Sequence, residues 1–147
     1  MAASPVAGRG VVPCPYSTAL HRVRPSTMNT HRVGRRFEAL AAEYLLARGW
    51  TILARNYRFG RKEIDLIVSR GRTLAFVEVK GRRGDGYGHP LEAITWRKRR
   101  EISQVARHWI QENGGRWDTI RFDAIAVREV SDGPPTLEHT PDAWRRS

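Results

Sequence analysis

The spacing of apolar residues along the chain predicts two amphipathic helices. Between residues 32 and 48 apolar side chains recur at intervals of three and four, and Gly49 directly after them favours a C-terminal stop. A second stripe of the same period covers residues 94–110, where Thr95 is suited to cap the first turn and the stretch NGG at 113–115 ends the helix. Each helix therefore has one apolar face to bury.

Further segments predict β-strands. WTILARNYR at 50–58 is rich in strand-forming residues, and EIDLIVSRGRTLAFVEVK at 63–80 predicts two strands joined at SRGR. TIRFDAIAV at 119–127 predicts another strand, and TLEHTPDAW at 136–144 a last short one. The glycine-rich, basic segment at 81–90 has no apolar period and predicts a loop. The expected order is α-β-β-β-α-β-β.

The N-terminal segment differs in composition from the rest of the chain. Residues 1–27 contain three arginines, no acidic residue and no sustained apolar period, so we expect a disordered basic tail over residues 1–30 and one domain over residues 31–147. The tail is faintly similar to an organellar transit peptide, but Met28, just before the first patterned segment, favours a later translational start.

Charge and cysteine content narrow the class of function. The formal net charge is +11, from 26 Lys and Arg against 15 Asp and Glu, and a charge of this sign attracts nucleic acid. No apolar run approaches the length of a membrane span, so we expect no membrane partner. The single cysteine, Cys14, excludes an internal disulfide and a cysteine-based zinc site, which favours the reducing cytoplasm.

Charged residues interrupt the two strands of segment 63–80. Alternation along a strand places Glu63 and Asp65 on one face, and Glu78 and Lys80 on one face of the next strand. A turn centred on residues 70–71 sets Glu78 opposite Glu63 and makes Asp65 its diagonal neighbour, with roughly 5 to 8 Å between their β-carbons. We therefore expect the carboxylates to converge.

Clustered carboxylates repel one another, and a divalent cation would compensate for that repulsion. Hard oxygen ligands without thiols favour Mg²⁺ or Mn²⁺ over zinc. Lys80, on the same face as Glu78, can then orient an attacking water or stabilise negative charge on a phosphate, as hydrolysis of a phosphodiester requires. Taken alone, such residues are more typical of a strand face exposed to water, but both strands also carry apolar residues that require cover.

The motifs resemble a known superfamily. An Asp, a stretch of strand and turn, and then Glu-x-Lys is the signature of the PD-(D/E)xK nucleases, matched here by Asp65, Glu78 and Lys80. The ordered set GRRFEALAAEYLLARGWTILARNYR, EIDLI, FVEVK and RFDAIAV is similar to the YraN family of small bacterial predicted endonucleases, related in fold to archaeal Holliday junction resolvases. The resemblance covers residues 32 to 128. It implies an α/β, restriction-endonuclease-like core with a mixed central sheet flanked by helices.

The resemblance also implies a further metal-binding glutamate on the first helix, at the position of Glu38. Helix geometry agrees, because Glu38 lies about 100° from the centre of the apolar stripe, whereas Glu43 lies near 240° on the polar side. A surface ion pair of Glu38 with Arg35 is the alternative. One departure from the family pattern is Arg61 and Lys62 where a Gly-Glu pair is usual, and Glu63 is expected to have only a supporting role at the strand edge.

Several basic and aromatic residues are candidates for contacts with nucleic acid. Arginines and lysines near the predicted site would contact phosphates without reading sequence, and three aromatic residues would stack on unpaired bases. Lys98 lies within the apolar stripe of its helix, so its stem should pack while its ammonium group reaches the site. The phosphate-contact candidates are Arg55, Arg58, Arg82, Arg83 and Lys98, and the aromatic candidates are Tyr57, Tyr87 and Trp96.

Two functions remain open from the sequence. The first is a metal-dependent endonuclease acting on DNA, including branched or structured DNA, with catalytic residues Glu38, Asp65, Glu78 and Lys80 and with Mg²⁺ or Mn²⁺ on the three carboxylates. Its resolvase version predicts a homodimer. The second is a non-catalytic protein that binds nucleic acid, on RNA or the ribosome. The intact acidic residues favour the enzyme and DNA, because binding alone gives no reason to direct carboxylates at a polyanion.

Overall fold

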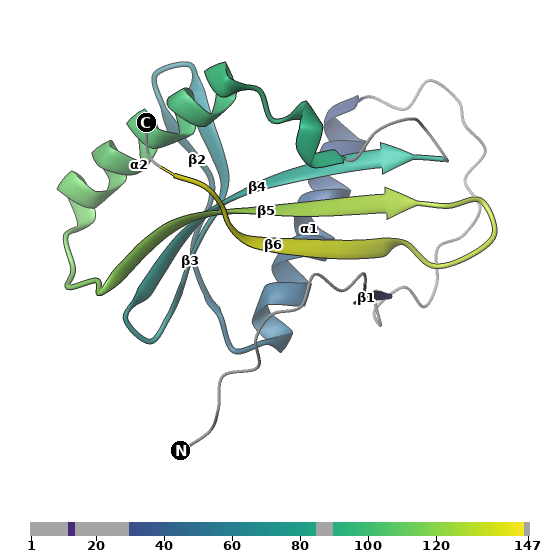
Figure 1. The fold of residues 1–147 in the computed structure, drawn as a ribbon, viewed down its shortest axis with the longest axis horizontal. Helices are drawn as coiled ribbons and strands as arrows, with labels where there is room; N and C mark the ends of the chain where they lie inside the picture. Colours follow the sequence, from purple (N-terminus) through teal and green to yellow (C-terminus); the bar gives the residue numbers. More distant parts are fainter. Residues whose placement is uncertain (1–11, 14–29, 85–89, 146–147) are drawn as a thin grey trace.

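The computed structural model describes residues 12–13, 30–84 and 90–145 (Figure 1). Only Val12–Pro13 and Thr30 of the expected tail lie within these ranges, so the expectation of disorder over residues 1–30, and Met28 with it, lies outside the described residues. Val12–Pro13 form a two-residue strand, β1, which pairs with the last strand of the chain.

The remaining elements follow the predicted order, with one short 3-10 helix in addition. The bounds are α1 Thr30–Ala47, β2 Thr51–Phe59, β3 Lys62–Arg70, β4 Thr73–Arg83, η1 Pro90–Ala93, α2 Trp96–Asn113, β5 Thr119–Glu129 and β6 Thr136–Trp144. The first three residues of the predicted loop at 81–90 belong instead to β4, because they continue the pairing with β5 as far as Arg83 and Glu129.

The strands form one mixed sheet in the order β1-β6-β5-β4-β3-β2. β4 and β5 pair in parallel and every other neighbouring pair is antiparallel. The parallel pair requires a long connection, which α2 supplies. The expected α/β class with a mixed central sheet flanked by helices is confirmed.

The helices cover opposite faces of the sheet, and α1 lies behind it in the view of Figure 1. α1 contributes Phe37 and Leu45 to a core with Val77 of β4, whereas α2 contributes Ile102 to a second core with Phe76. The sheet is therefore buried on both faces, as the apolar residues of its strands require. No helix in the described ranges has the length and apolar character needed to cross a membrane.

Local signals in the sequence account for the ends of α2. The Thr95 hydroxyl accepts a hydrogen bond from the Lys98 amide at 3.1 Å, so the predicted N-cap is present. At the other end Gly114 has a φ of 64°, and its amide donates to the Ile110 carbonyl at 2.8 Å. These caps fix where the basic first turn of α2 lies relative to β4.

The β3–β4 hairpin has a tighter turn than the sequence predicted. Arg70 pairs with Thr73, which leaves Gly71, at a φ of 58°, and Arg72 as a two-residue turn. Such turns match the twist of paired strands and are favoured when glycine supplies the positive φ. The predicted register was therefore wrong by two residues, and Asp65 rather than Glu63 comes into line with Glu78.

Strict alternation along β3 was also a wrong prediction, because the strand changes face at Asp65. Leu66 lies in the core under α1 and Ile67 in the core under α2, but Ile64 lies under α2 as well, where alternation would place it under α1. The neighbouring strand β2 has a positive φ of 50° at Asn56, between the pairs that Arg55 and Tyr57 make with β3. The outer part of the β2–β3 hairpin therefore twists away from β4 at Asp65.

Candidate active site

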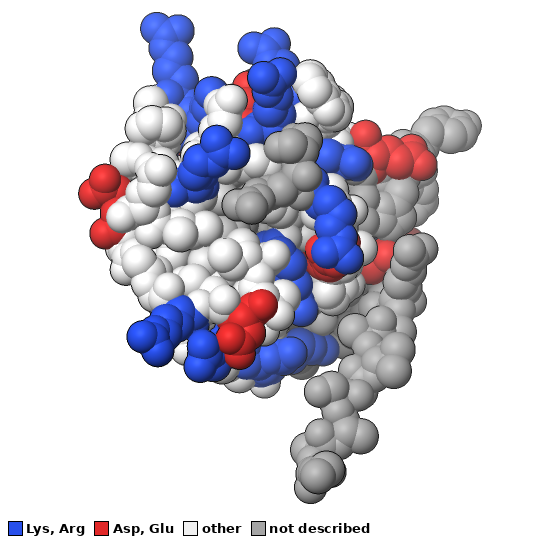
Figure 2. Space-filling model, turned by 60° about the vertical axis from the view of Figure 1, so that its left-hand side comes forward, with Lys and Arg blue, Asp and Glu red and all other residues white. Residues whose placement is uncertain are grey.

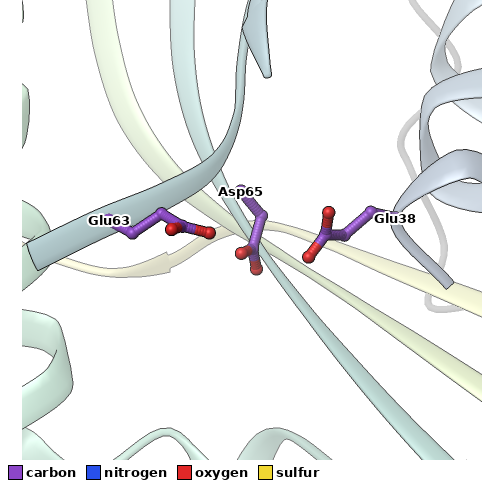
Figure 3. Close-up of side chains that lie close together, drawn as sticks. All are labelled: Glu38, Glu63 and Asp65. Carbon is purple, nitrogen blue, oxygen red and sulfur yellow. The ribbon is translucent and has the colours of Figure 1, made fainter. Parts of the chain in front are cut away.

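Three carboxylates from two elements meet beside this twist. Glu38 comes from α1, and Glu63 and Asp65 come from β3, with ligand oxygens all within 4.8 Å of one another. Figure 3 shows Asp65 between the other two, with Glu38 approaching from the helix. Glu38 thus reaches the strand carboxylates as predicted, and Glu63, which the sequence gave a supporting role, joins the same group.

Glu78 lies beside this group on β4 and is 2% exposed. Its Oε1 is 3.3 Å from the Lys80 ammonium nitrogen and 3.8 Å from that of Lys98. Its Oε2 is buried and has no hydrogen-bond partner among the described residues. We call Glu38, Glu63, Asp65 and Glu78 together the acidic site.

Asp65 belongs to the group of three carboxylates and also interacts with β4, the strand that carries Glu78. Its Oδ2 accepts a hydrogen bond from the Val79 amide at 2.8 Å, at the point where β3 leaves β4. Its charge also acts on Glu78, whose pKa it raises. Asp65 and Glu78 therefore point to one place, and the change of face along β3 brings that place within reach of α1.

The acidic site resists full ionisation. Burial, and then the charge of Asp65, raise the pKa of Glu78 to about 8, against a smaller opposing effect of Lys98 and Lys80. Burial likewise raises the pKa of Asp65. Burial and then Asp65 raise the pKa of Glu38, which a hydrogen bond from Asn56 opposes. Lys80 and Lys98 lie beside Glu78 and Arg58 pairs with Glu63, yet the pKa values of Glu38, Asp65 and Glu78 all remain raised.

A divalent cation fits this donor set. The oxygen ligands are hard, three carboxylates have oxygens within 4.8 Å of one another, and the unpartnered Oε2 of Glu78 beside them is a buried acceptor. A buried acceptor without a partner is costly, and coordination would remove that cost. The site therefore has the composition of a site for a hard divalent cation.

The Lys98 ammonium group reaches the acidic site, as its place in the apolar stripe of its helix predicted. Its stem lies along α2 and its Nζ approaches Glu78, while its side chain is 30% exposed. Lys80 has a similar exposure of 29% beside the same carboxylate. Both ammonium groups therefore remain accessible to a ligand that approaches the acidic site.

The arginine candidates fall into two groups. Arg55 and Arg82 are exposed at the margins of the site. Arg58 instead donates to the Glu63 carboxylate at 2.7 Å, and Arg83 lies 3.3 Å from a Glu129 oxygen, so both are engaged within the protein. Figure 2 shows Lys and Arg side chains gathered along the upper and lower margins of the face drawn, with a mostly uncharged surface between them.

The structure describes two of the three aromatic candidates. Tyr57 stacks near His108 with 6.3 Å between ring centroids, and it is half-buried. Trp96 is 65% exposed at the start of α2. Tyr87 lies outside the described residues.

Sequence reasoning missed a second buried charge network. Asp123 of β5 is 1% exposed and bonds to His139 at 2.7 Å and to the Arg121 guanidinium at 3.0 and 3.1 Å. It also accepts the Asp142 amide at 3.0 Å, where the register of β6 shifts against β5. Burial alone would raise the pKa of Asp123, but these partners hold it below its usual value.

This network lies under α1, where Tyr44 meets the His139 ring edge-on at 5.8 Å between centroids. An aspartate in an apolar strand was visible in the sequence, but two of its partners, His139 and the Asp142 amide, come from β6, and the Asp142 amide lies where the register shifts, which no local pattern indicates. We assign the Asp123 network to holding β6 on the sheet.

Comparisons with known proteins identify the family of the chain. Residues 37–127 match the model of the family described as Uncharacterised protein family UPF0102. The UPF0102 protein of Rhodococcus jostii is 45% identical over 113 residues, covering 76% of this chain and 95% of that protein. The UPF0102 protein of Chlorobium limicola is 44% identical over 119 residues, covering 78% and 92%.

Among solved structures, SfsA of Pyrococcus furiosus in complex with Ca²⁺ is similar with a TM-score of 0.35 and 12% identity, over 78% of this chain and 63% of that one. The family match spans α1 through β5 and therefore contains every residue of the acidic site. On the family match and these relatives, the chain belongs to the UPF0102 family, which is the family that its sequence motifs indicated.

Proposed function

We propose that the protein is a metal-dependent endonuclease that hydrolyses phosphodiester bonds in DNA. The observation that carries the proposal is the acidic site itself, where three carboxylates cluster beside Glu78, two partly exposed lysines approach Glu78, and a buried oxygen of Glu78 lacks a partner among the described residues. A surface that only bound nucleic acid would gain nothing from carboxylates directed at a polyanion. Clustered groups with raised pKa values are typical of catalytic sites.

Each residue has a role that its position supports. Asp65 and Glu78 would hold the cation from the two strands, with Glu38 and Glu63 completing its ligands. When bound, a divalent cation supplies a water of lowered pKa and stabilises charge on the phosphate.

Lys80 would hold the attacking water or the phosphate oxygen, and Lys98 would neutralise the phosphate on the α2 side. Arg55 and Arg82 would contact backbone phosphates further away. Arg58 is better suited to orient Glu63, since it already donates to that carboxylate. Arg83 would support the end of β4, where it pairs with Glu129 of β5.

The test is cleavage of labelled substrates that differ in shape. A four-way junction, a flap, single-stranded DNA and structured RNA are each incubated with Mg²⁺, Mn²⁺ or a chelator. We expect the native chain to cut DNA only with metal, Asp65→Asn and Lys80→Ala to lose cleavage, and the exposed Glu43→Gln to retain it. Absence of cutting on every substrate, or equal cutting by the variants, would leave only the role of a nucleic-acid-binding protein.

Action on a four-way junction adds one requirement. Resolution needs two paired cuts, so that version of the proposal includes a homodimer in the cytoplasm. Analytical ultracentrifugation with and without the junction measures the oligomeric state. A monomer that cuts flaps or single strands would restrict the proposal to substrates that need a single cut.

A further inference from the structure

Trp96 is placed differently from the buried tryptophans of the protein. It is 65% exposed, whereas Trp50, Trp109 and Trp144 are 4%, 6% and 7% exposed. A large aromatic side chain gains free energy from burial, and one left open on a surface is typical of a binding site. Among the described residues, it has the highest exposure of the large apolar side chains that are open to solvent.

The surroundings of Trp96 are cationic. It is followed directly by Arg97, Lys98, Arg99 and Arg100, and no acidic residue lies in the first turn of α2. The Arg100 guanidinium lies 5.4 Å from the centroid of the indole ring. An exposed ring with a cation over it is suited to a planar ligand that carries negative charge nearby, which describes a nucleotide.

The first turn of α2 links Trp96 to the acidic site. Lys98 lies two residues further along the helix, about 200° around its axis, and its Nζ approaches Glu78 at 3.8 Å. The two side chains therefore leave the same turn on opposite sides. A strand that crosses this turn can meet Lys98 with a phosphate and Trp96 with a base a few nucleotides away.

We propose that Trp96 is a stacking platform for an unpaired base, so that the DNA substrate carries single-stranded nucleotides next to the phosphodiester that is cut. This inference rests on the function proposed above and specifies its substrate class. Bases within a duplex are already stacked on their neighbours, so only an unpaired base can occupy the ring. Flaps, splayed ends and single strands satisfy this condition, and a fully paired duplex does not.

Binding measurements test the inference without cleavage. Asp65→Asn is used as the background in the presence of chelator, and fluorescence anisotropy follows a labelled single-stranded oligothymidine and a blunt duplex of equal length. Trp96→Ala and Trp96→Leu should weaken binding of the single strand by roughly five- to a hundredfold and leave duplex binding within about twofold. Trp96→Phe, which keeps an aromatic ring, should restore most of the single-strand affinity.

Arg97→Ala is the matched control on the neighbouring position, where the side chain is 88% exposed and pairs only with Glu101 among the described residues. It removes a charge and no ring, so it should weaken both ligands equally and lower the salt dependence of binding. Trp96→Ala should leave that salt dependence unchanged. Binding of oligothymidine should also lower the access of acrylamide to the exposed indole in the native chain.

Equal weakening of both ligands by Trp96→Ala, no weakening at all, or no binding of single strands by the native chain would overturn the inference. Its failure is distinguishable from failure of the proposed function. Metal-dependent cutting that is indifferent to Trp96 rejects the stacking role and keeps the nuclease. Stacking through Trp96 without cleavage of any substrate keeps the platform and rejects the nuclease.

Discussion

The carboxylate of Asp65 accepts the backbone amide of Val79 at 2.8 Å, so a strand residue of the acidic site is fixed by the neighbouring strand itself. This bond holds Asp65 in line with Glu78 where β3 departs from the sheet. Asp65→Asn keeps an acceptor oxygen for that amide but loses the charge. We therefore expect the fold to persist and cleavage to fall by at least roughly a hundredfold, as measured by single-turnover assays with Mg²⁺.

Glu38 should matter for metal affinity rather than for the fold. Glu38→Gln removes one of the three clustered carboxylates and should weaken Mn²⁺ binding by roughly ten- to a hundredfold in isothermal titration calorimetry. Glu43→Gln is the matched control, because Glu43 lies on the same helix with an exposed side chain. Identical affinities for the two variants would contradict the assignment of Glu38 to the metal.

Glu78 should destabilise the metal-free protein at neutral and alkaline pH. Its folded pKa, raised to about 8 from an ordinary 4.5, means that the native state loses stability as pH rises between these values. Glu78→Gln removes this cost and should raise the thermal midpoint by roughly 5 °C at pH 8 with chelator, but much less at pH 5. Calorimetry at both pH values measures the difference, and a lower midpoint for the variant at pH 8 would oppose it.

The Asp123 network should contribute acid-sensitive stability. Because its partners lower the folded pKa of Asp123 below the ordinary 3.8, its contribution is fully present above 3.8 and is lost as pH falls through the folded value. Asp123→Asn should cost roughly 3 kcal/mol at pH 7 in urea unfolding, and the gap to the native protein should narrow below pH 4. The exposed Asp118→Asn, which loses only a surface pair with Arg72, should stay within about 0.5 kcal/mol.

Gly81 should be required for the close packing of α1 against β4. A β-carbon built there would lie 1.9 Å from the Phe37 ring, so Gly81→Ala should destabilise the fold by roughly 1 to 3 kcal/mol and displace the helix that carries Glu38. Gly34→Ala, on α1 with nothing within 4 Å, should instead stabilise it by about 0.5 to 1 kcal/mol. Chemical denaturation of both variants measures the change in the free energy of unfolding. A loss for Gly81→Ala alone would show that the cost comes from its contact with Phe37 and not from replacing glycine in general.

Much of the fold follows from local patterns. The two helices, the caps of α2 and the order of strands could be predicted, because apolar period and turn residues act within a few positions. Asp65, Glu78 and Lys80 could be found for the same reason, since one turn joins their strands. The match to a family supplied Glu38, which lies far from them in sequence.

What the sequence did not disclose depends on tertiary geometry. The register of β3 and β4 depended on which two residues form the turn, and the inclusion of Glu63 depended on a twist that Asn56 accommodates in the adjacent strand. The bond from the Asp142 amide to Asp123 depended on the register shift between β5 and β6. In each case a single backbone conformation, set by packing, redirected several side chains.

The contact between Phe37 and Gly81 determines when the acidic site can be completed during folding. The strand hairpin can form early from residues close in sequence, but Glu38 joins its carboxylates only after the helix docks. Metal affinity should therefore appear as the last event of refolding, and a half-assembled chain would be harmless to nucleic acid. In stopped-flow experiments, the recovery of Mn²⁺ binding would lag behind the recovery of strand structure.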